Sequence, residues 1–160
     1  MRIFVDADAC PVKDIIVHIA KQKNIPVTML IDTSHVLNDG YSTVITVEKA
    51  KDSVDMALIN RVKSGDIVVT QDYGLAAMAL EKDAKVLNQN GLVYTNENID
   101  GLLMSRHMGQ KIRRSGGRTK GPGRRTREDD ERFCRAFEAV IDTLIPRSQS
   151  RTDAPPGPAR

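Results

Sequence analysis

Apolar residues along the chain follow two spacings, which separate short runs of strand type from longer stripes of helical type. The strand-type runs are rich in β-branched residues and are bounded by Gly, Pro, Asn or Asp. They predict strands over residues 3–8, 27–31, 41–47, 67–70 and 85–88. Apolar residues at helical intervals predict helices over residues 11–24, 52–62, 75–81, 98–114 and 128–145.

Strands and helices alternate along most of the chain, at the spacing expected of βα units and a mainly parallel sheet. A chain of 160 residues is long enough to form a stable core without disulfides. We therefore expect one α/β domain over residues 1–145, which includes a basic segment at 106–127 and a closing helix at 128–145. Residues 146–160 are rich in Ser, Pro and Gly, and we expect them to form a disordered tail.

Two carboxylates end the first predicted strand. Asp6 and Asp8 are two residues apart, so their side chains point the same way if the strand continues through Ala7. Like charges on one short face repel, and a bound cation relieves that repulsion. Because ligands of open parallel α/β sheets bind at the carboxyl ends of the strands, the motif predicts a metal site at this edge.

Two further acids occupy positions that favour the same site. Asp55 lies on the apolar stripe of its predicted helix, where a carboxylate needs a partner. Asp72 directly follows the buried strand at 67–70. Several of the acids also have a purely structural interpretation. Asp8 could cap the first helix, Asp52 could be a helix cap rather than a metal ligand, and Asp72 could be an ordinary turn residue.

Charge is distributed unevenly along the chain. Residues 1–105 contain 10 Lys or Arg against 14 Asp or Glu, whereas residues 106–127 contain nine Lys or Arg and no acid. An acidic body with one concentrated basic segment suits a polyanionic partner, and we expect nucleic acid. The predicted contacts to its phosphates are Lys13, Arg113, Arg114, Arg118, Lys120, Arg124, Arg125 and Arg127.

Several other classes of protein are disfavoured. No apolar run approaches the roughly 18 residues that span a bilayer, and no signal peptide precedes the first strand, so we expect no membrane association. Cys10 and Cys134 show no zinc-type spacing, which fits a reduced, cytoplasmic protein. Without a neighbouring histidine, Cys10 is interpreted as a small buried residue, and His35 as an exposed loop residue.

Four motifs in order carry a family resemblance. They are VDADACPVK at 5–13, DSVD at 52–55, VTQD at 69–72, and the basic tract with Gly and Pro at 115–127. Together they resemble the bacterial YaiI/YqxD family over all but the last dozen or so residues. That family is similar to the PIN-like nucleases. The resemblance implies a PIN-like three-layer sandwich, with helices on both faces of a mostly parallel sheet in the strand order 3-2-1-4-5.

The resemblance also implies roles for the acids. Asp6 matches the acid on the first strand of the PIN-like pattern, Asp55 or Asp52 the acid on the helix after the third strand, and Asp72 the acid after the fourth. Asp8 is an additional carboxylate of the YaiI/YqxD motif. The implied strand order makes the first and fourth strands neighbours, so Asp6 and Asp72 are expected to meet. Carboxylate oxygens suit Mg²⁺ or Mn²⁺, and such ions support phosphodiester hydrolysis.

The expected function is therefore metal-dependent cleavage of RNA or single-stranded nucleic acid, with RNA expected in preference to DNA. One alternative is a nucleic-acid-binding module without catalysis. The other is a phosphatase similar to the haloacid dehalogenases, because Ile3–Asp8 also resembles the nucleophile motif of that family. Cys10 and the early helix start at Pro11 depart from the dehalogenase pattern, and no Gly-Asp-x-x-x-Asp signature follows.

Overall fold

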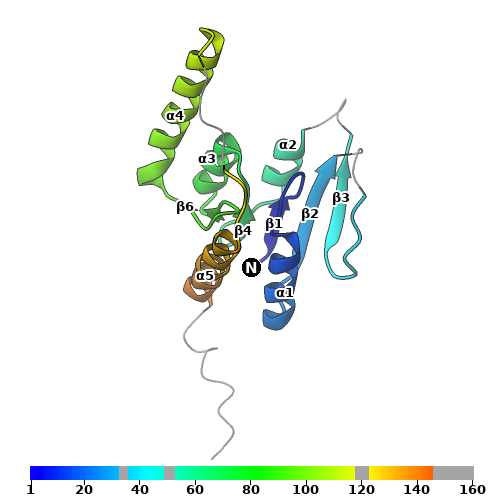
Figure 1. Cartoon of the computed structure of the whole chain (residues 1–160). Helices are drawn as coiled ribbons and strands as arrows, with labels where there is room; N and C mark the ends of the chain where they lie inside the picture. The colour runs from blue at the N-terminus through cyan, green and yellow to red at the C-terminus, as the bar shows by residue number, and fades with distance from the viewer. Residues whose placement is uncertain (33–35, 49–52, 118–122, 146–160) are drawn as a thin grey trace, which may run out of the picture.

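The computed structural model describes residues 1–32, 36–48, 53–117 and 123–145. Its centre is a six-stranded sheet in the order β3-β2-β1-β4-β5-β6, in which only β6 is antiparallel to its neighbour (Figure 1). The strands are β1 (Ile3–Asp6), β2 (Val27–Asp32), β3 (Thr43–Val47), β4 (Ile67–Val69), β5 (Lys85–Leu87) and β6 (Val93–Tyr94). The predicted order of the first five strands is confirmed, and β6 is an addition.

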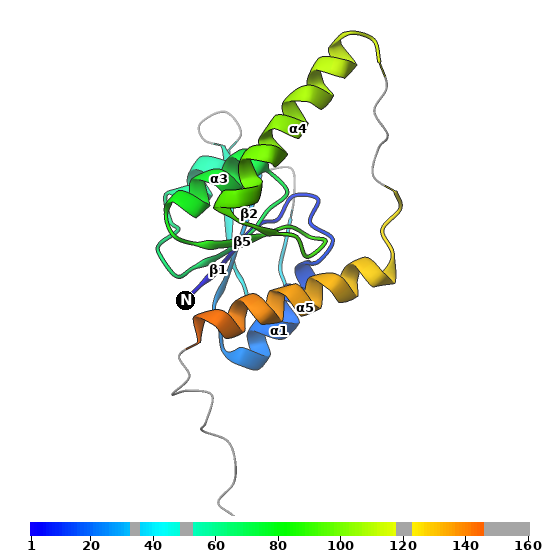
Figure 2. The same ribbon diagram turned by 90° about the vertical axis from the view of Figure 1, so that its left-hand side faces the viewer.

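Helices cover both faces of the sheet, as the predicted three-layer sandwich requires (Figures 1 and 2). They are α1 (Lys13–Lys23), α2 (Val54–Ile59), α3 (Tyr73–Glu81), α4 (Asn96–Arg114) and α5 (Arg127–Leu144). α1 and α5 share one apolar cluster on one face, and α2, α3 and the first turns of α4 share another on the opposite face. Among the described residues, no helix is long and apolar enough to cross a membrane.

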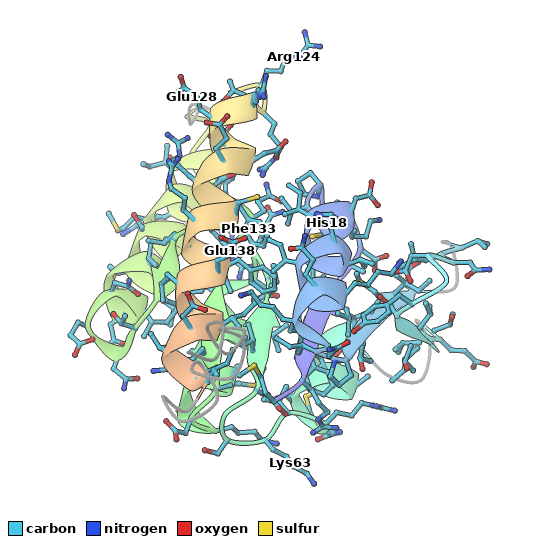
Figure 3. All side chains as sticks on the ribbon, turned by 90° about the horizontal axis from the view of Figure 1, so that it is seen from below. His18, Lys63, Arg124, Glu128, Phe133 and Glu138 are labelled. Atoms are coloured by element: carbon cyan, nitrogen blue, oxygen red, sulfur yellow. The ribbon has the colours of Figure 1, made fainter. Side chains whose placement is uncertain are left out.

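Successive residues of β1 face the two clusters in turn. Ile3 and Val5 pack toward α1 and α5, whereas Phe4 packs toward α2 and α3. On the α5 side, Phe133 and Phe137 are fully buried and stacked, with ring centroids 5.3 Å apart. Figure 3 shows α5, with Phe133 labelled, beside α1 over this face of the sheet. The sheet is therefore buried on both faces, which explains the nearly continuous apolar runs of its central strands.

Local contacts explain where element boundaries differ from the predicted ones. The first helix begins at Lys13 rather than Pro11, because Ala9 is in the left-handed region (φ 56°) and a turn follows it. β3 begins at Thr43 because the Asp39 carboxylate accepts the backbone N–H groups of Tyr41 and Ser42 and holds them in a turn. β6 was missed because a two-residue strand has no measurable periodicity.

The path of the chain creates a crevice between two strands. From central β1 the chain adds β2 and β3 on one side, then returns to place β4, β5 and β6 on the other. The helices after β1 and β4 therefore diverge to opposite faces of the sheet. In open α/β sheets such a switch point leaves a crevice at the carboxyl ends of the strands, and here it lies between β1 and β4.

Candidate functional site

A cavity of about 350 Å³ opens at this switch point. Residues from the ends of β1 and β4, from the loop after β5 and from α4 line its wall. The lining residues are Asp6, Asp8, Ala9, Cys10, Val69, Thr70, Gln71, Asp72, Tyr73, Gln89 and Arg106. Three of the four predicted acids thus share one cavity, and the fourth, Asp55, is in electrostatic contact with two of them.

Asp6 is positioned by the register between β1 and β4. Val5 lies opposite Val69, so the next residues, Asp6 and Thr70, are neighbours at the strand ends. The Thr70 hydroxyl, on a residue only 2% exposed, donates to Asp6 Oδ2 over 3.1 Å. Burial raises the pKa of Asp6, the Thr70 hydrogen bond opposes that rise, and the charges of Asp8 and Asp72 add to it.

Asp8 reaches the cavity from the turn after β1. The strand ends at Asp6, but the backbone N–H of Ala7 still donates to Leu30 O, so buried Ala7 turns away from the two acids. Asp8 Oδ2 accepts the backbone N–H of Asp32 at the end of β2 over 3.3 Å. The alternative in which Asp8 caps the first helix is wrong, because Val12 occupies that position without a side-chain cap.

Asp72 has two contacts at once. Its Oδ1 accepts the backbone N–H groups of Gly74 and Leu75, so it caps α3 and is more than an ordinary turn residue. The same oxygen lies 3.6 Å from Nη1 of Arg106, which approaches from α4. Thr70 Oγ1 accepts the Asp72 backbone N–H over 3.0 Å, and this bond fixes the loop between strand and helix.

Asp55 enters from the first turn of α2 and is half-buried, as its place on the apolar stripe predicts. Burial, the negative charge of Asp72 and a hydrogen bond to that carboxylate raise the pKa of Asp55 to about 6. Asp6 raises it further and Arg106 lowers it. Asp55 therefore keeps its proton to a higher pH than an ordinary aspartate does. Ser53 caps α2, and Asp52 lies outside the described residues.

The acids suit a hard divalent cation by chemistry, although they are not arranged as a complete cage. Within the described part of the chain, no three His, Cys, Asp or Glu side chains are placed to hold an ion together. Mg²⁺ does not require such a cage, since it usually keeps several waters and binds through one or two carboxylates. Asp6 and Asp72 fit that requirement: burial chiefly raises the pKa of Asp6, and the negative charges of Asp8 and Asp72 raise it further, so a cation would be stabilised there.

A basic group lies beside the acids, and two others act on the neighbouring Cys10. Arg106 faces Asp72 across the cavity, and the positive charges of Lys13 and Arg125 oppose the rise that burial causes in the pKa of Cys10. Cys10 itself is 7% exposed, in agreement with its interpretation as a packed residue. Arg106 lines the acidic cavity itself and is therefore within reach of an anion that enters it.

Arg125 is engaged within the protein rather than presented to solvent. Its guanidinium donates to Asp130 Oδ1, Asn90 Oδ1 and Gln89 O at 2.7–2.8 Å. These bonds join the loop after β5 to the start of α5. Gly91, in the same loop, packs directly against the backbone of α5. Its φ is +85°, and an added Cβ would lie 2.7 Å from the backbone oxygen of Arg132, so only glycine fits there. The predicted phosphate contact by Arg125 is thus replaced in this structure by a structural role.

The other predicted basic residues are dispersed. Arg113 and Arg114 are exposed at the end of α4, and Arg127 forms an exposed ion pair with Glu131 at 3.5 Å. Arg124 is exposed and points away from the body of the protein (Figure 3). Arg118, Lys120, His35 and the predicted tail at 146–160 lie outside the described residues.

Arg106 and Gln89 were missed as cavity residues by the sequence analysis, although detectable signals existed. Arg106 follows apolar Leu102 and Leu103 by four and three residues, so it continues the packed side of α4, as Asp55 does on α2. Gln89 follows β5 at its carboxyl end, the same edge that identifies Asp6. Its side chain is hydrogen-bonded to Gln71, and the pair closes one side of the cavity.

Comparison with known proteins identifies a family over nearly the same range as the described fold. A family model described as "Uncharacterized BCR, YaiI/YqxD family" matches residues 4–143. A UPF0178 protein of Ruminiclostridium cellulolyticum is 69% identical over 141 residues, which are 88% of this chain and 92% of that protein. UPF0178 proteins of Clostridium acetobutylicum and Alkaliphilus oremlandii are 52% and 50% identical, over 88% and 96% of this chain and 97% and 99% of their own lengths.

Proposed function

The chain belongs to the YaiI/YqxD family, and since that membership names no reaction, we propose from the site that it is a metal-dependent phosphodiesterase that cleaves RNA or single-stranded nucleic acid. One observation carries the proposal. Carboxylates from the ends of β1 and β4 and from α2 gather at the switch point of the sheet, and the Arg106 guanidinium faces them. This combination suits a reaction in which a cation and a phosphate occupy the same cavity.

Asp6 and Asp72 are the residues that would hold Mg²⁺ or Mn²⁺, with Asp8 beside them. When bound, such an ion activates water and neutralises charge on the phosphodiester. Thr70 orients the Asp6 carboxylate, and the backbone N–H groups at the start of α3 orient that of Asp72. Both carboxylates are thus fixed before a ligand arrives, which lowers the cost of organising the site.

Asp55 is suited to proton transfer. Its pKa of about 6 leaves most of the group ionised at neutral pH while keeping it basic enough to accept a proton from attacking water. Arg106 is suited to the opposite charge: it lies beside Asp72 in the present structure and can turn to a phosphate oxygen of a substrate. Lys13 and the exposed Arg113 and Arg114 offer further contacts to the polynucleotide backbone.

Calorimetric titration of Mn²⁺ tests the ion site before any substrate is chosen. We expect binding to the wild type and none to the Asp6→Asn, Asp72→Asn double variant. Asn also caps helices, so this variant keeps the start of α3 intact. Asp14→Asn is the matched control, because Asp14 is exposed on α1 outside the cavity. Equal binding by wild type and double variant would refute the assignment of Asp6 and Asp72.

Cleavage is then assayed with single-stranded RNA, single-stranded DNA and duplex DNA of one sequence. We expect turnover with Mn²⁺ or Mg²⁺, its loss in Asp6→Asn and its retention in Asp14→Asn. Salt-sensitive binding to these polynucleotides without turnover under either metal would instead identify a non-catalytic binding module.

Phosphate-monoester hydrolysis is the second candidate, and the contact between Thr70 and Asp6 favours it. In that reaction the Asp6 carboxylate attacks phosphorus, the P–O bond to the alcohol breaks and the alcohol leaves, and water later hydrolyses the aspartyl phosphate; the Thr70 hydroxyl holds the Asp6 carboxylate in place. It predicts a phosphoryl group bound covalently to Asp6 after incubation with a phosphate ester. Mass spectrometry of the intact protein detects that adduct, and the nuclease mechanism predicts its absence.

A further inference from the structure

The outward side of α4 carries an apolar stripe that no described element covers. Met104, Met108 and Ile112 are 61%, 49% and 44% exposed, and they are spaced four residues apart, so they lie one above the other. Ile99, which faces the sheet, precedes Met108 by nine residues, about two and a half turns, and is therefore on the opposite side of the helix. The carboxyl-terminal half of α4 extends away from the sheet in Figures 1 and 2.

A single exposed apolar residue needs no explanation, but an aligned set on a projecting helix does. The exposed stripe and the packed stripe make α4 apolar on two opposite sides. The apolar residues on the packed side contact α3, with which α4 makes its main contacts. The outward side has the size and spacing of a helix-packing surface without its partner.

Charges beside the stripe indicate what that partner is. The acids Glu97 and Asp100 lie in the first turns of α4, and Lys111 and Arg114 lie in the last turns, all exposed. Asp100 and Lys111 are separated by eleven residues, about three turns, and therefore share one flank of the stripe. A helix with this pattern is complementary to an antiparallel copy of itself.

The register follows from the numbering. If two α4 helices cross antiparallel near Arg106, Met104 of one helix packs against Met108 of the other. The same register brings Asp100 of one helix within one residue of the level of Lys111 of the other, on the same flank and in both directions. A parallel pair would set Asp100 of both helices at one level and Lys111 of both at another, on opposite flanks, so no opposite charges would pair. The charge pattern thus selects one orientation, and it satisfies the rule that a two-fold interface is self-complementary.

We propose that the outward face of α4, formed by Met104, Met108 and Ile112 with Asp100 and Lys111 on its flank, is a homodimer interface in which two copies pair antiparallel. Arg106 follows Ile99 by seven residues and faces the cavity, so the interface leaves the acidic site open. The proposal does not depend on the proposed nuclease function. One helix pair is a small interface, so the dimer is expected to dissociate on dilution.

Sedimentation equilibrium across a concentration series reaching the millimolar range tests the proposal. We expect the wild type to show a monomer–dimer equilibrium and Met108→Glu to raise its Kd by about tenfold or more, because the new charge is buried on association. Met56→Glu is the matched control: Met56 is 47% exposed on α2, away from this face, and its replacement should leave Kd unchanged.

A charge exchange tests the orientation. Asp100→Lys and Lys111→Asp should each weaken the dimer, and the double exchange should restore it. A wild type that stays monomeric throughout the series overturns the proposal. A dimer that is not weakened by Met108→Glu or by either single charge change also overturns it. Loss of RNA affinity in Met108→Glu, without any change in the measured mass, would assign the stripe to nucleic-acid binding instead.

Discussion

Replacement of Asp55 by Asn perturbs the electrostatics of the cavity without changing its shape. The ordinary pKa of an aspartate is 3.8, whereas burial, Asp72 and Asp6 raise the pKa of Asp55 to about 6. Below 3.8 the group is protonated in folded and unfolded protein alike. Between the two values the folded protein binds more protons, so its free energy of unfolding falls as the pH rises through this window.

The size of the effect follows from the same two values. At about 1.4 kcal/mol per pH unit, the full difference corresponds to roughly 3 kcal/mol. Asp55 is only half-buried, so water screens the repulsion and we expect about 1–2 kcal/mol in practice. The Asn side chain removes the charge but can still donate a hydrogen bond to Asp72. Asp55→Asn should therefore be more stable than the wild type at pH 7.

Urea unfolding from pH 3.5 to 7.5, in buffer with a chelator so that no cation relieves the repulsion, measures this difference. The two proteins should have equal stability at the acid end and diverge as the pH rises toward 6. Asp14→Asn, which removes an exposed carboxylate outside the cavity, should follow the wild type throughout. An Asp55→Asn variant that is no more stable than the wild type at pH 7 would refute the reasoning.

Three further substitutions test the scaffold. Asp66→Ala should lower the free energy of unfolding, measured in urea, by about 2–4 kcal/mol, because Asp66 is 4% exposed and pairs with Arg2. It should leave Mn²⁺ binding unchanged, because Asp66 lies at the opposite end of β4 from the cavity. Arg125→Met should speed amide hydrogen exchange at residues 88–92, and unchanged exchange would contradict its structural role. Thr126→Ala should cost about 1 kcal/mol in urea, since Thr126 caps α5.

Sequence reasoning predicted most of the fold because the central strands have strong patterns. The runs at β1, β2 and β4 are buried on both faces, so their apolar residues are nearly continuous. β6 depends instead on a turn at Gly91 that packs on the backbone of α5, a tertiary contact with no local pattern. Its existence was therefore not predictable from periodicity.

The residues of the site likewise divide into those that a local sequence pattern predicts and those that depend on tertiary contacts. Asp6 and Asp72 follow buried strands, and Asp55 interrupts an apolar stripe, so each has a signature in one stretch of sequence. Arg125 has none, because its three acceptors include two that precede it by more than thirty residues. A count of charges treats it like Arg124, although Arg124 is exposed and Arg125 is held by the fold.

The central place of β1 has a consequence for the synthesis of the protein. β1 leaves the ribosome before the other described strands, yet Ile3 and Val5 share their apolar cluster with Phe133 and Phe137 of α5, the last described helix. Its other sheet neighbour, β4, also comes much later than β2. The nascent chain must therefore keep β1 incompletely packed until α5 has been synthesised. A cavity built on β1 and β4, with one wall joined to α5 by Arg125, can mature only after that point.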